Sequence, residues 1–158
     1  RTLALYPQHV QALLNRGSAL QELERYTEAL ASYDRAIQIA PAYASAHFNR
    51  GSALEKLHRP QDAVTAYERA IALDPNSAET YNNCGNALRA LRRADEAIPL
   101  YDRALALKPD YVDAITNRNT AFFELKRYDE ALTGFAAALR LRPDFPEALY
   151  NQIGRAHV

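Results

Sequence analysis

The sequence predicts an all-α fold, an α-solenoid of stacked helix-turn-helix units, and three observations lead to this prediction. Five of the eight prolines recur at a constant step of 34 residues, namely Pro7, Pro41, Pro75, Pro109 and Pro143. Small and aromatic residues recur at the same step. The strong helix formers Ala and Leu dominate the composition. A fixed period of this length is typical of solenoids made of repeated helical pairs.

Four further columns of residues keep the 34-residue step, each with its own packing role. They are Gly17, Gly51 and Gly85; Ala29, Ala63, Ala97 and Ala131; Tyr33, Tyr67, Tyr101 and Phe135; and Ala36, Ala70, Ala104 and Ala138. Glycine inside a helix costs about 1 kcal/mol relative to alanine. We expect that cost to be recovered because the missing side chain lets the second helix of the unit approach closely. The aromatic residue then fills the space between the helices.

The repeated prolines give the boundaries of the units, because the residue before a proline is pushed away from helical angles and the second helix must end there. With the proline at position 32, the complete repeats span 10–43, 44–77, 78–111 and 112–145. Residues 1–9 are the expected end of an upstream repeat, and residues 146–158 the first helix of a partial fifth one. In the first repeat we expect helices near residues 11–23 and 27–40. Helices this short need tertiary packing to be stable.

Local departures from the pattern carry their own expectations. Asn119 stands where the other repeats have glycine, and Gly134 on the second helix of the same repeat is expected to make room for it. Pro60 is suitably placed at the start of a second helix. Pro99 lies early in another second helix, where we expect a slight bend.

A small residue in the first helix, followed by alanine, an aromatic, alanine and a closing proline, resembles the tetratricopeptide repeat family. The resemblance covers the whole chain. It implies a right-handed superhelix whose first helices line a concave groove, and a protein-protein interaction module in place of an enzyme. No catalytic constellation accompanies the repeats, although a longer parent protein could still be an enzyme.

Asparagine forms a further column, at position 6 of each first helix. Its members are Asn15, Asn49, Asn83, Asn117 and Asn151. The sequence indicates no packing role for them, and the neighbouring positions 2, 9 and 13 are mostly polar. This face should therefore line the concave surface of the solenoid. The neighbours expected to contact a ligand are Ser18, Ser52, Asn86 and Thr120 at position 9, with Phe48 and Asn82 at position 5.

The column predicts how a ligand would be held. A primary amide offers two donors and an acceptor, so it can bond to a peptide unit in both directions. Helix pairs stack about 10 Å apart, and an extended chain advances about 3.3 Å per residue. One asparagine per repeat thus matches about three ligand residues. The expected ligand is a protein or peptide in an extended conformation. Acidic residues outnumber basic ones along the groove, which favours a ligand with some basic character.

Three alternatives remain open at this stage. An asparagine ladder along the inner face is similar to that of O-linked N-acetylglucosamine transferases, where it holds protein substrates, and to that of kinesin light chains. The similarity implies that the chain could be the substrate-recruiting arm of such a glycosyltransferase. The asparagines could instead simply suit a solvated groove. Finally, the repeats could be a structural scaffold for self-assembly, with the groove unused.

One known ligand mode of the family is not expected here. Its co-chaperones clamp a terminal carboxylate with Lys, Asn and Arg side chains at five positions. Those positions are Leu14, Ser18, Asn49, Glu79 and Asn83 in this chain. Only Asn49 matches the clamp, and Glu79 would repel a carboxylate.

Charge and composition narrow the classes of partner. Lys+Arg and Asp+Glu number 19 each, which gives no electrostatic reason to expect nucleic acid or an anionic membrane. No stretch approaches the roughly 18 apolar residues of a membrane helix. Neither metal-ligand spacing nor a phosphate-binding loop occurs, so no metal and no cofactor is expected. The lone Cys84 excludes a disulfide scaffold. Together with the lack of a signal peptide it favours a cytoplasmic protein.

The two ends of the sequence carry a separate expectation. The chain starts at Arg1 and contains no methionine, so we expect it to be part of a longer protein. Solenoids need polar capping helices, and neither end has one. We therefore expect homo-oligomers that form through the uncapped ends, and a concentration-independent monomer mass in sedimentation would contradict this.

Overall fold

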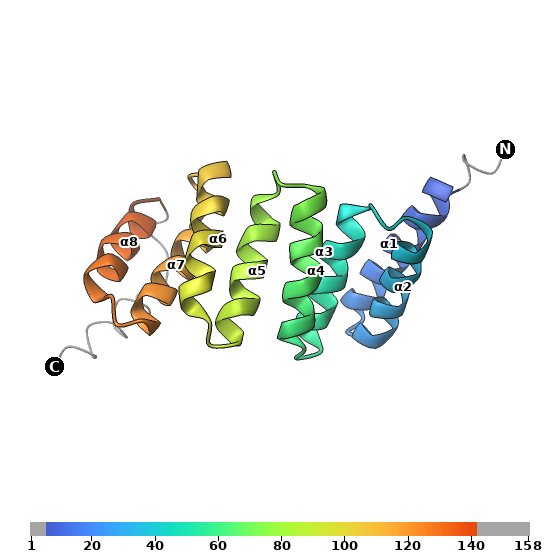
Figure 1. The fold of residues 1–158 in the computed structure, drawn as a ribbon, viewed down its shortest axis with the longest axis horizontal. Coiled ribbons are helices and arrows are strands. Elements are labelled where there is room, and N and C mark those ends of the chain that lie inside the picture. The colour runs from blue at the N-terminus through green and yellow to red at the C-terminus, as the bar shows by residue number, and fades with distance from the viewer. Residues whose placement is uncertain (1–5, 142–158) are drawn as a thin grey trace.

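The computed structural model describes residues 6–141 and the side chains of residues 9–140. In this part of the chain it contains α1 (Tyr6–Glu22), α2 (Tyr26–Ile39), α3 (Ala44–Lys56), α4 (Pro60–Leu73), α5 (Ala78–Ala90), α6 (Ala94–Leu107), α7 (Val112–Glu124) and α8 (Tyr128–Leu141). The helices follow one another along the long axis, from α1 and α2 at one end to α7 and α8 at the other (Figure 1). Each helix packs against the helices before and after it in the sequence. The predicted all-α solenoid is confirmed.

Helix boundaries match the sequence-based ones except at the start. In the first repeat α2 covers Tyr26–Ile39, one residue from the expected range. However, α1 begins at Tyr6, so residues 6–9 extend the first helix of this repeat, whereas the sequence assigned residues 1–9 to an upstream one. Pro7 falls in the first turn of α1, where its missing N–H leaves no intrahelical bond unmade. Residues 1–5 and the expected partial repeat at 146–158 lie outside the described residues.

The glycine and tyrosine columns interlock as the sequence predicted. Tyr33, Tyr67 and Tyr101 are fully buried. A Cβ atom added at Gly51 would lie 2.6 Å from Cε1 of the Tyr67 ring, and one added at Gly85 would lie 2.6 Å from the Tyr101 ring. Real Cβ atoms do not approach other atoms this closely. Glycine at this position therefore sets the distance between the two helices of a repeat.

In the fourth repeat the small residue lies on the second helix and the larger one on the first. Asn119 takes the place of glycine and is fully buried, and a Cβ atom on Gly134 would overlap its carboxamide. Gly134 thus makes the expected room for Asn119. The Nδ2 and Oδ1 atoms of Asn119 have no hydrogen-bond partner among the described residues. A buried amide without partners is unfavourable by roughly 1–3 kcal/mol. Asn119 therefore lowers the stability of the fourth repeat.

The turn inside each repeat has a backbone conformation that the sequence did not reveal. One residue per turn has a left-handed φ between 56° and 63°, and these residues are Glu24, His58, Arg92 and Lys126. The N–H of the following arginine donates to the carbonyl five residues earlier, at 2.8 Å from Arg25 to Leu20. This bond belongs to the Schellman motif that ends many helices. Glycine normally supplies the left-handed residue. Because these turns have no glycine at that position, the motif could not be predicted from the sequence.

Three members of the proline column, Pro41, Pro75 and Pro109, act as predicted at the ends of the second helices. The residues before them lie outside the helical region, with φ of −135°, −135° and −140° at Ala40, Asp74 and Lys108. These angles are those that a following proline imposes. Pro60 is the first residue of α4, and α6 runs unbroken through Pro99.

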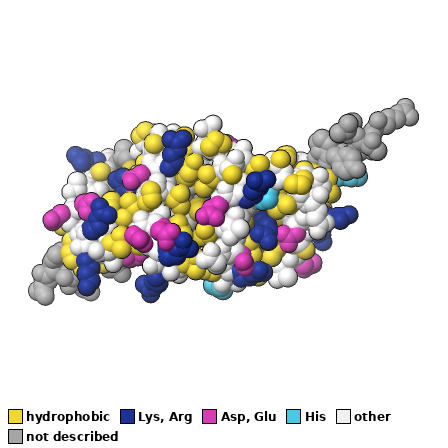
Figure 2. All heavy atoms as spheres, in the orientation of Figure 1, with side chains coloured by type: hydrophobic (Ala, Val, Ile, Leu, Met, Phe, Trp, Pro, Cys, Tyr) yellow, Lys and Arg dark blue, Asp and Glu magenta, His cyan; other side chains and the backbone are white. Residues whose placement is uncertain are grey.

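The surface mixes both signs of charge with apolar side chains. Figure 2 shows acidic and basic side chains interspersed over the visible face. Among the described residues, no helix combines the length and apolar character that a bilayer crossing requires.

Candidate functional site

The asparagine column lies on the first helices of the repeats, which form one row along the molecule. Direct contacts join α1 to α3, α3 to α5 and α5 to α7, in addition to the contacts between helices adjacent in sequence. Asn15 is exposed, and Asn49, Asn83 and Asn117 are half-buried. These four side chains therefore sit on the row of first helices with part of their surface open. Asn151 lies outside the described residues.

Amide groups of the third and fourth repeats are bonded to one another. Asn82 is buried, with 3% of its surface exposed. Its Nδ2 donates to Oδ1 of Asn83 at 3.2 Å, and its Oδ1 accepts from Nδ2 of Asn117 at 2.9 Å. Asn82 thus links the column across the repeat boundary and has little capacity left for a ligand. The sequence indicated no packing role for the column, and at Asn83 and Asn117 the structure adds hydrogen bonds to the buried Asn82.

The predicted neighbours at position 9 differ in what they can offer a ligand. Ser18 is exposed. Ser52 accepts a hydrogen bond from Nε2 of Gln21 in the preceding repeat at 3.2 Å. Asn86 accepts from the Tyr101 hydroxyl at 2.8 Å. Thr120 donates to a carbonyl of its own helix. Hydroxyl and amide groups here are thus partly engaged within the chain, and they order the surface next to the asparagines.

Buried tyrosines of the second helices donate hydrogen bonds to side chains of the first helices, which could not be predicted from the sequence. The Tyr33 hydroxyl donates to Oε1 of Gln21, and that of Tyr67 donates to Oε2 of Glu55, both at 2.5 Å. Gln21 and Glu55 occupy position 12 of their repeats. Burial raises the pKa of the Tyr67 hydroxyl, and the nearby Glu55 carboxylate raises it further. The hydroxyl stays protonated and remains a donor.

Glu55 gives a pH-dependent prediction. Burial raises the pKa of its carboxyl, although the hydrogen bond from Tyr67 opposes this. Because the folded state holds this proton more tightly than the unfolded state, its contribution to stability falls as pH rises from the ordinary glutamate value through the raised one. Glu55→Gln keeps an acceptor for Tyr67, as Gln21 does for Tyr33 in the first repeat. We expect the variant to gain thermal stability over wild type at pH 7 but not at about pH 4. An equal difference at both pH values would contradict this assignment.

An ion pair crosses the groove surface between the third and fourth repeats. Arg89 donates to both carboxylate oxygens of Glu124, at 2.7 Å from Nη2 and 3.3 Å from Nε. Beside it lies a hollow of about 460 Å³ lined by Asn86, Arg89, Ala90, Arg92, Asn117 and Glu124. This hollow places two predicted site residues, Asn86 and Asn117, around one space. Arg89 at position 12 is a further groove residue that the sequence analysis did not include.

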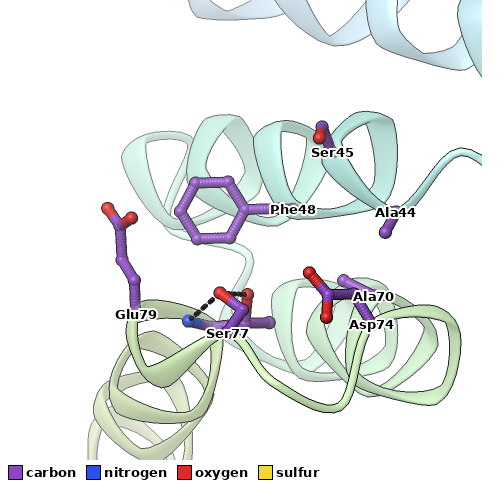
Figure 3. Close-up of a pocket in the computed structure, with 8 residues that line it drawn as sticks. Ala44, Ser45, Phe48, Ala70, Asp74, Ser77 and Glu79 are labelled. Carbon is purple, nitrogen blue, oxygen red and sulfur yellow. Dashed lines mark hydrogen bonds between the residues drawn. The ribbon is translucent and has the colours of Figure 1, made fainter. Parts of the chain in front are cut away.

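Phe48 marks a second hollow near the N-terminal ends of the first helices. Its ring contacts the Tyr67 ring, with centroids 5.9 Å apart. It is half-buried and lines a pocket of about 180 Å³ between the second and third repeats (Figure 3). The predicted site residues therefore do not form one pocket. They lie along a row that has a polar hollow at one junction and an aromatic one at another.

Comparisons with known families agree with this architecture. Two models described as tetratricopeptide repeat match residues 48–112 and 88–153, and one described as TPR repeat matches residues 17–57. No curated protein matches the chain.

Solved structures share the fold over most of the chain. A crystal structure of MamA is 26% identical, with a TM-score of 0.82 over 90% of this chain and 84% of that one. The first TPR of Spaghetti (RPAP3), bound to the HSP90 peptide SRMEEVD, is 26% identical, with a TM-score of 0.74 over 75% of this chain and 94% of that one. PilF of Pseudomonas aeruginosa is 24% identical, with a TM-score of 0.80, and the match covers 90% of this chain and 65% of that one. This similarity shows the fold alone.

Proposed function

The chain belongs to the tetratricopeptide repeat family and is a protein-interaction module, and we propose that it holds an extended polypeptide segment along its first helices through the asparagine column. The observation that carries this proposal is the column itself: one partly open carboxamide per repeat, from Asn15 to Asn117, on helices that contact one another in a row. A similar structure, the first TPR of Spaghetti (RPAP3), is bound to a peptide. This supports a peptide as the class of ligand.

Hydrogen-bonding capacity left on the asparagines supports the proposal. Asn49 makes no side-chain hydrogen bond to the described residues, and Asn15 accepts one from Gln11 at 2.9 Å. Asn117 keeps its Oδ1 acceptor, because Asn82 engages only the Nδ2 of that amide. The Oδ1 of Asn83 accepts from Asn82, and its Nδ2 faces the Tyr67 hydroxyl but has a second hydrogen for a ligand. A peptide unit offers one donor and one acceptor. Every described member of the column can thus bond to a passing backbone.

The expected affinity follows from the nature of these bonds. Each hydrogen bond contributes about 1 kcal/mol net, and ordering an unstructured ligand offsets part of the total. A carboxamide recognises the ligand backbone whatever its side chains. Binding through the column alone is therefore modest and sequence-tolerant, and selectivity must come from neighbouring side chains.

An unbiased peptide array tests the proposal. We expect wild-type protein to bind many extended sequences, and replacement of Asn49, Asn83 and Asn117 by Ala to weaken the best binders by about tenfold or more, since about 1.4 kcal/mol corresponds to a factor of ten. The matched control is Gln61→Ala, which removes an exposed primary amide from α4, a second helix. Its binding should equal that of wild type. Unchanged binding by the folded triple variant would refute the role of the column.

Folding of the triple variant needs its own measurement. Loss of Asn83 and Asn117 leaves both ends of the buried Asn82 amide unpaired, which should lower the melting temperature. Asn49→Ala avoids this because Asn49 has no such contact. The single variant should therefore keep the wild-type melting temperature and still lose part of the binding.

A further inference from the structure

The pocket beside Phe48 lies at one junction of the row and combines an aromatic wall with two carboxylates. It has a volume of about 180 Å³ and is lined by Ala44, Ser45, Phe48, Ala70, Asp74, Ser77, Glu79 and Thr80. Sites for drug-sized molecules have volumes of about 300–1,000 Å³. The pocket is thus of the size of one side chain. Its lining comes from α3, the end of α4 and the start of α5, so it belongs to the boundary between the second and third repeats.

The lining has a definite polarity. Figure 3 shows the Phe48 ring and the Asp74 carboxylate projecting into the same space, with the Glu79 carboxylate beyond the ring. Ser77 and Thr80 are occupied with each other, since the Ser77 hydroxyl accepts from both N–H and Oγ1 of Thr80, at 3.2 and 2.7 Å. Asp74 accepts one backbone N–H, that of Asn76. Neither Asp74 nor Glu79 has a salt-bridge partner in the part of the chain that the structure describes.

The next junction along the solenoid carries different residues at the corresponding repeat positions. Position 31 of the repeat, which is Asp74 at the pocket, is Lys108 there, and position 34, which is Ser77, is Tyr111. The Lys108 ammonium lies 5.0 Å from the centre of the Tyr111 ring. A cation over an aromatic ring thus occupies the junction between the third and fourth repeats. At the preceding junction the charge at position 31 is reversed, the aromatic residue comes from Phe48, and the space is open.

We propose that this pocket binds the guanidinium group of an arginine side chain on the bound polypeptide. A guanidinium stacks on an aromatic face and donates to carboxylates in a planar fork. The Phe48 ring would stack on the face of the guanidinium group, and the carboxylates of Asp74 and Glu79 would accept hydrogen bonds from its N–H edges. The inference rests on the proposed function: the asparagine column tolerates any sequence, and a cation pocket at a single junction fixes the register of the ligand. Selected ligands carry an arginine at that point.

A blocked single amino acid tests the pocket separately from the column, since it is too short to span two asparagines. The probe is N-acetyl-arginine N-methylamide, titrated into ¹⁵N-labelled protein and followed by backbone amide shifts. The reference probe is the citrulline analogue, which has nearly the same shape and no charge. We expect the largest shifts at Phe48, Ser77 and Glu79, and an apparent Kd at least fivefold lower for the arginine probe than for the citrulline probe.

Variants complete the experiment. Asp74→Asn with Glu79→Gln should bring the arginine probe to the level of the citrulline probe, while Asn at position 74 can still accept the Asn76 N–H. The control is Asp113→Asn, which neutralises the counterpart of Glu79 at the next junction and should leave the arginine Kd unchanged. Equal binding of both probes, or shifts confined to residues away from the pocket, would overturn the proposal. If the triple Ala variant bound peptides as wild type does, but the arginine probe bound the pocket as expected, only the role of the asparagine column would be refuted.

Discussion

Gly51→Val should lower the free energy of unfolding by about 3 kcal/mol, at the upper end of the range for overpacked cores. The added Cβ would stand 2.6 Å from the Tyr67 ring, which is fully buried and cannot turn aside. Either α3 and α4 separate or the ring leaves its place. Both outcomes disturb the centre of the core, because Tyr67 packs in the same cluster as Leu54 and Tyr101.

Chemical denaturation followed by helical circular dichroism measures this effect. Lys56→Val is the matched control, because Lys56 lies exposed on the same helix and the substitution tests only the lower helix propensity of valine. That propensity difference amounts to less than about 0.7 kcal/mol. If Gly51→Val were no more destabilised than Lys56→Val, close approach would not be the reason for the glycine column.

Gly134→Ala should lower the free energy of unfolding by about 2–3 kcal/mol, and Asn119→Gly should rescue it. The new methyl group would overlap the buried Asn119 carboxamide, and overpacking of this kind is costly. In the double variant the fourth repeat has the pairing of the second, which carries Gly51 at position 8 and Ala66 at position 23. The alanine then adds helix propensity without a clash.

A double-mutant cycle measures the coupling between the two positions. We expect a coupling energy of about 2 kcal/mol, within the range for residues in direct contact. Asn119→Gly alone should cost less than Gly134→Ala alone, since it removes an amide whose polar atoms have no partner among the described residues. Additive effects would mean that the two residues do not share a space.

Packing columns could be predicted from the sequence because each is a repeated solution to one local problem. Glycine opposite tyrosine, and extended angles before proline, follow from residue type and spacing alone. The start of α1 could not, because Pro7 has the same spacing as the closing prolines although it lies in the first turn of a helix. The left-handed turn residues were also missed, since positions such as His58 carry no glycine.

Contacts on the groove surface could be predicted only in part. The asparagines lie on the first helices as expected, but the bond between Asn82 and Asn117 depends on the offset between neighbouring repeats. The same holds for the Tyr67 hydroxyl, which reaches Glu55 only because the two helices lie close together. A column of tyrosines predicts that their rings fill the core. The sequence does not show which side chain each hydroxyl contacts. The pocket between Phe48 and Asp74 likewise forms from three separate helices.

The central claim is that the asparagines hold the ligand by its backbone. An ester scan of a peptide selected on the array tests it most directly: each peptide bond in turn is replaced by an ester, which removes one N–H donor and keeps the side chains. The account predicts that affinity falls at the bonds whose N–H meets an open Oδ1, as at Asn49 and Asn117, with these bonds separated by about three ligand residues per repeat. It also predicts that Asn49→Ala abolishes the loss at one of these sites. Affinity that is unchanged at every ester position, but lost when side chains are replaced, would contradict it.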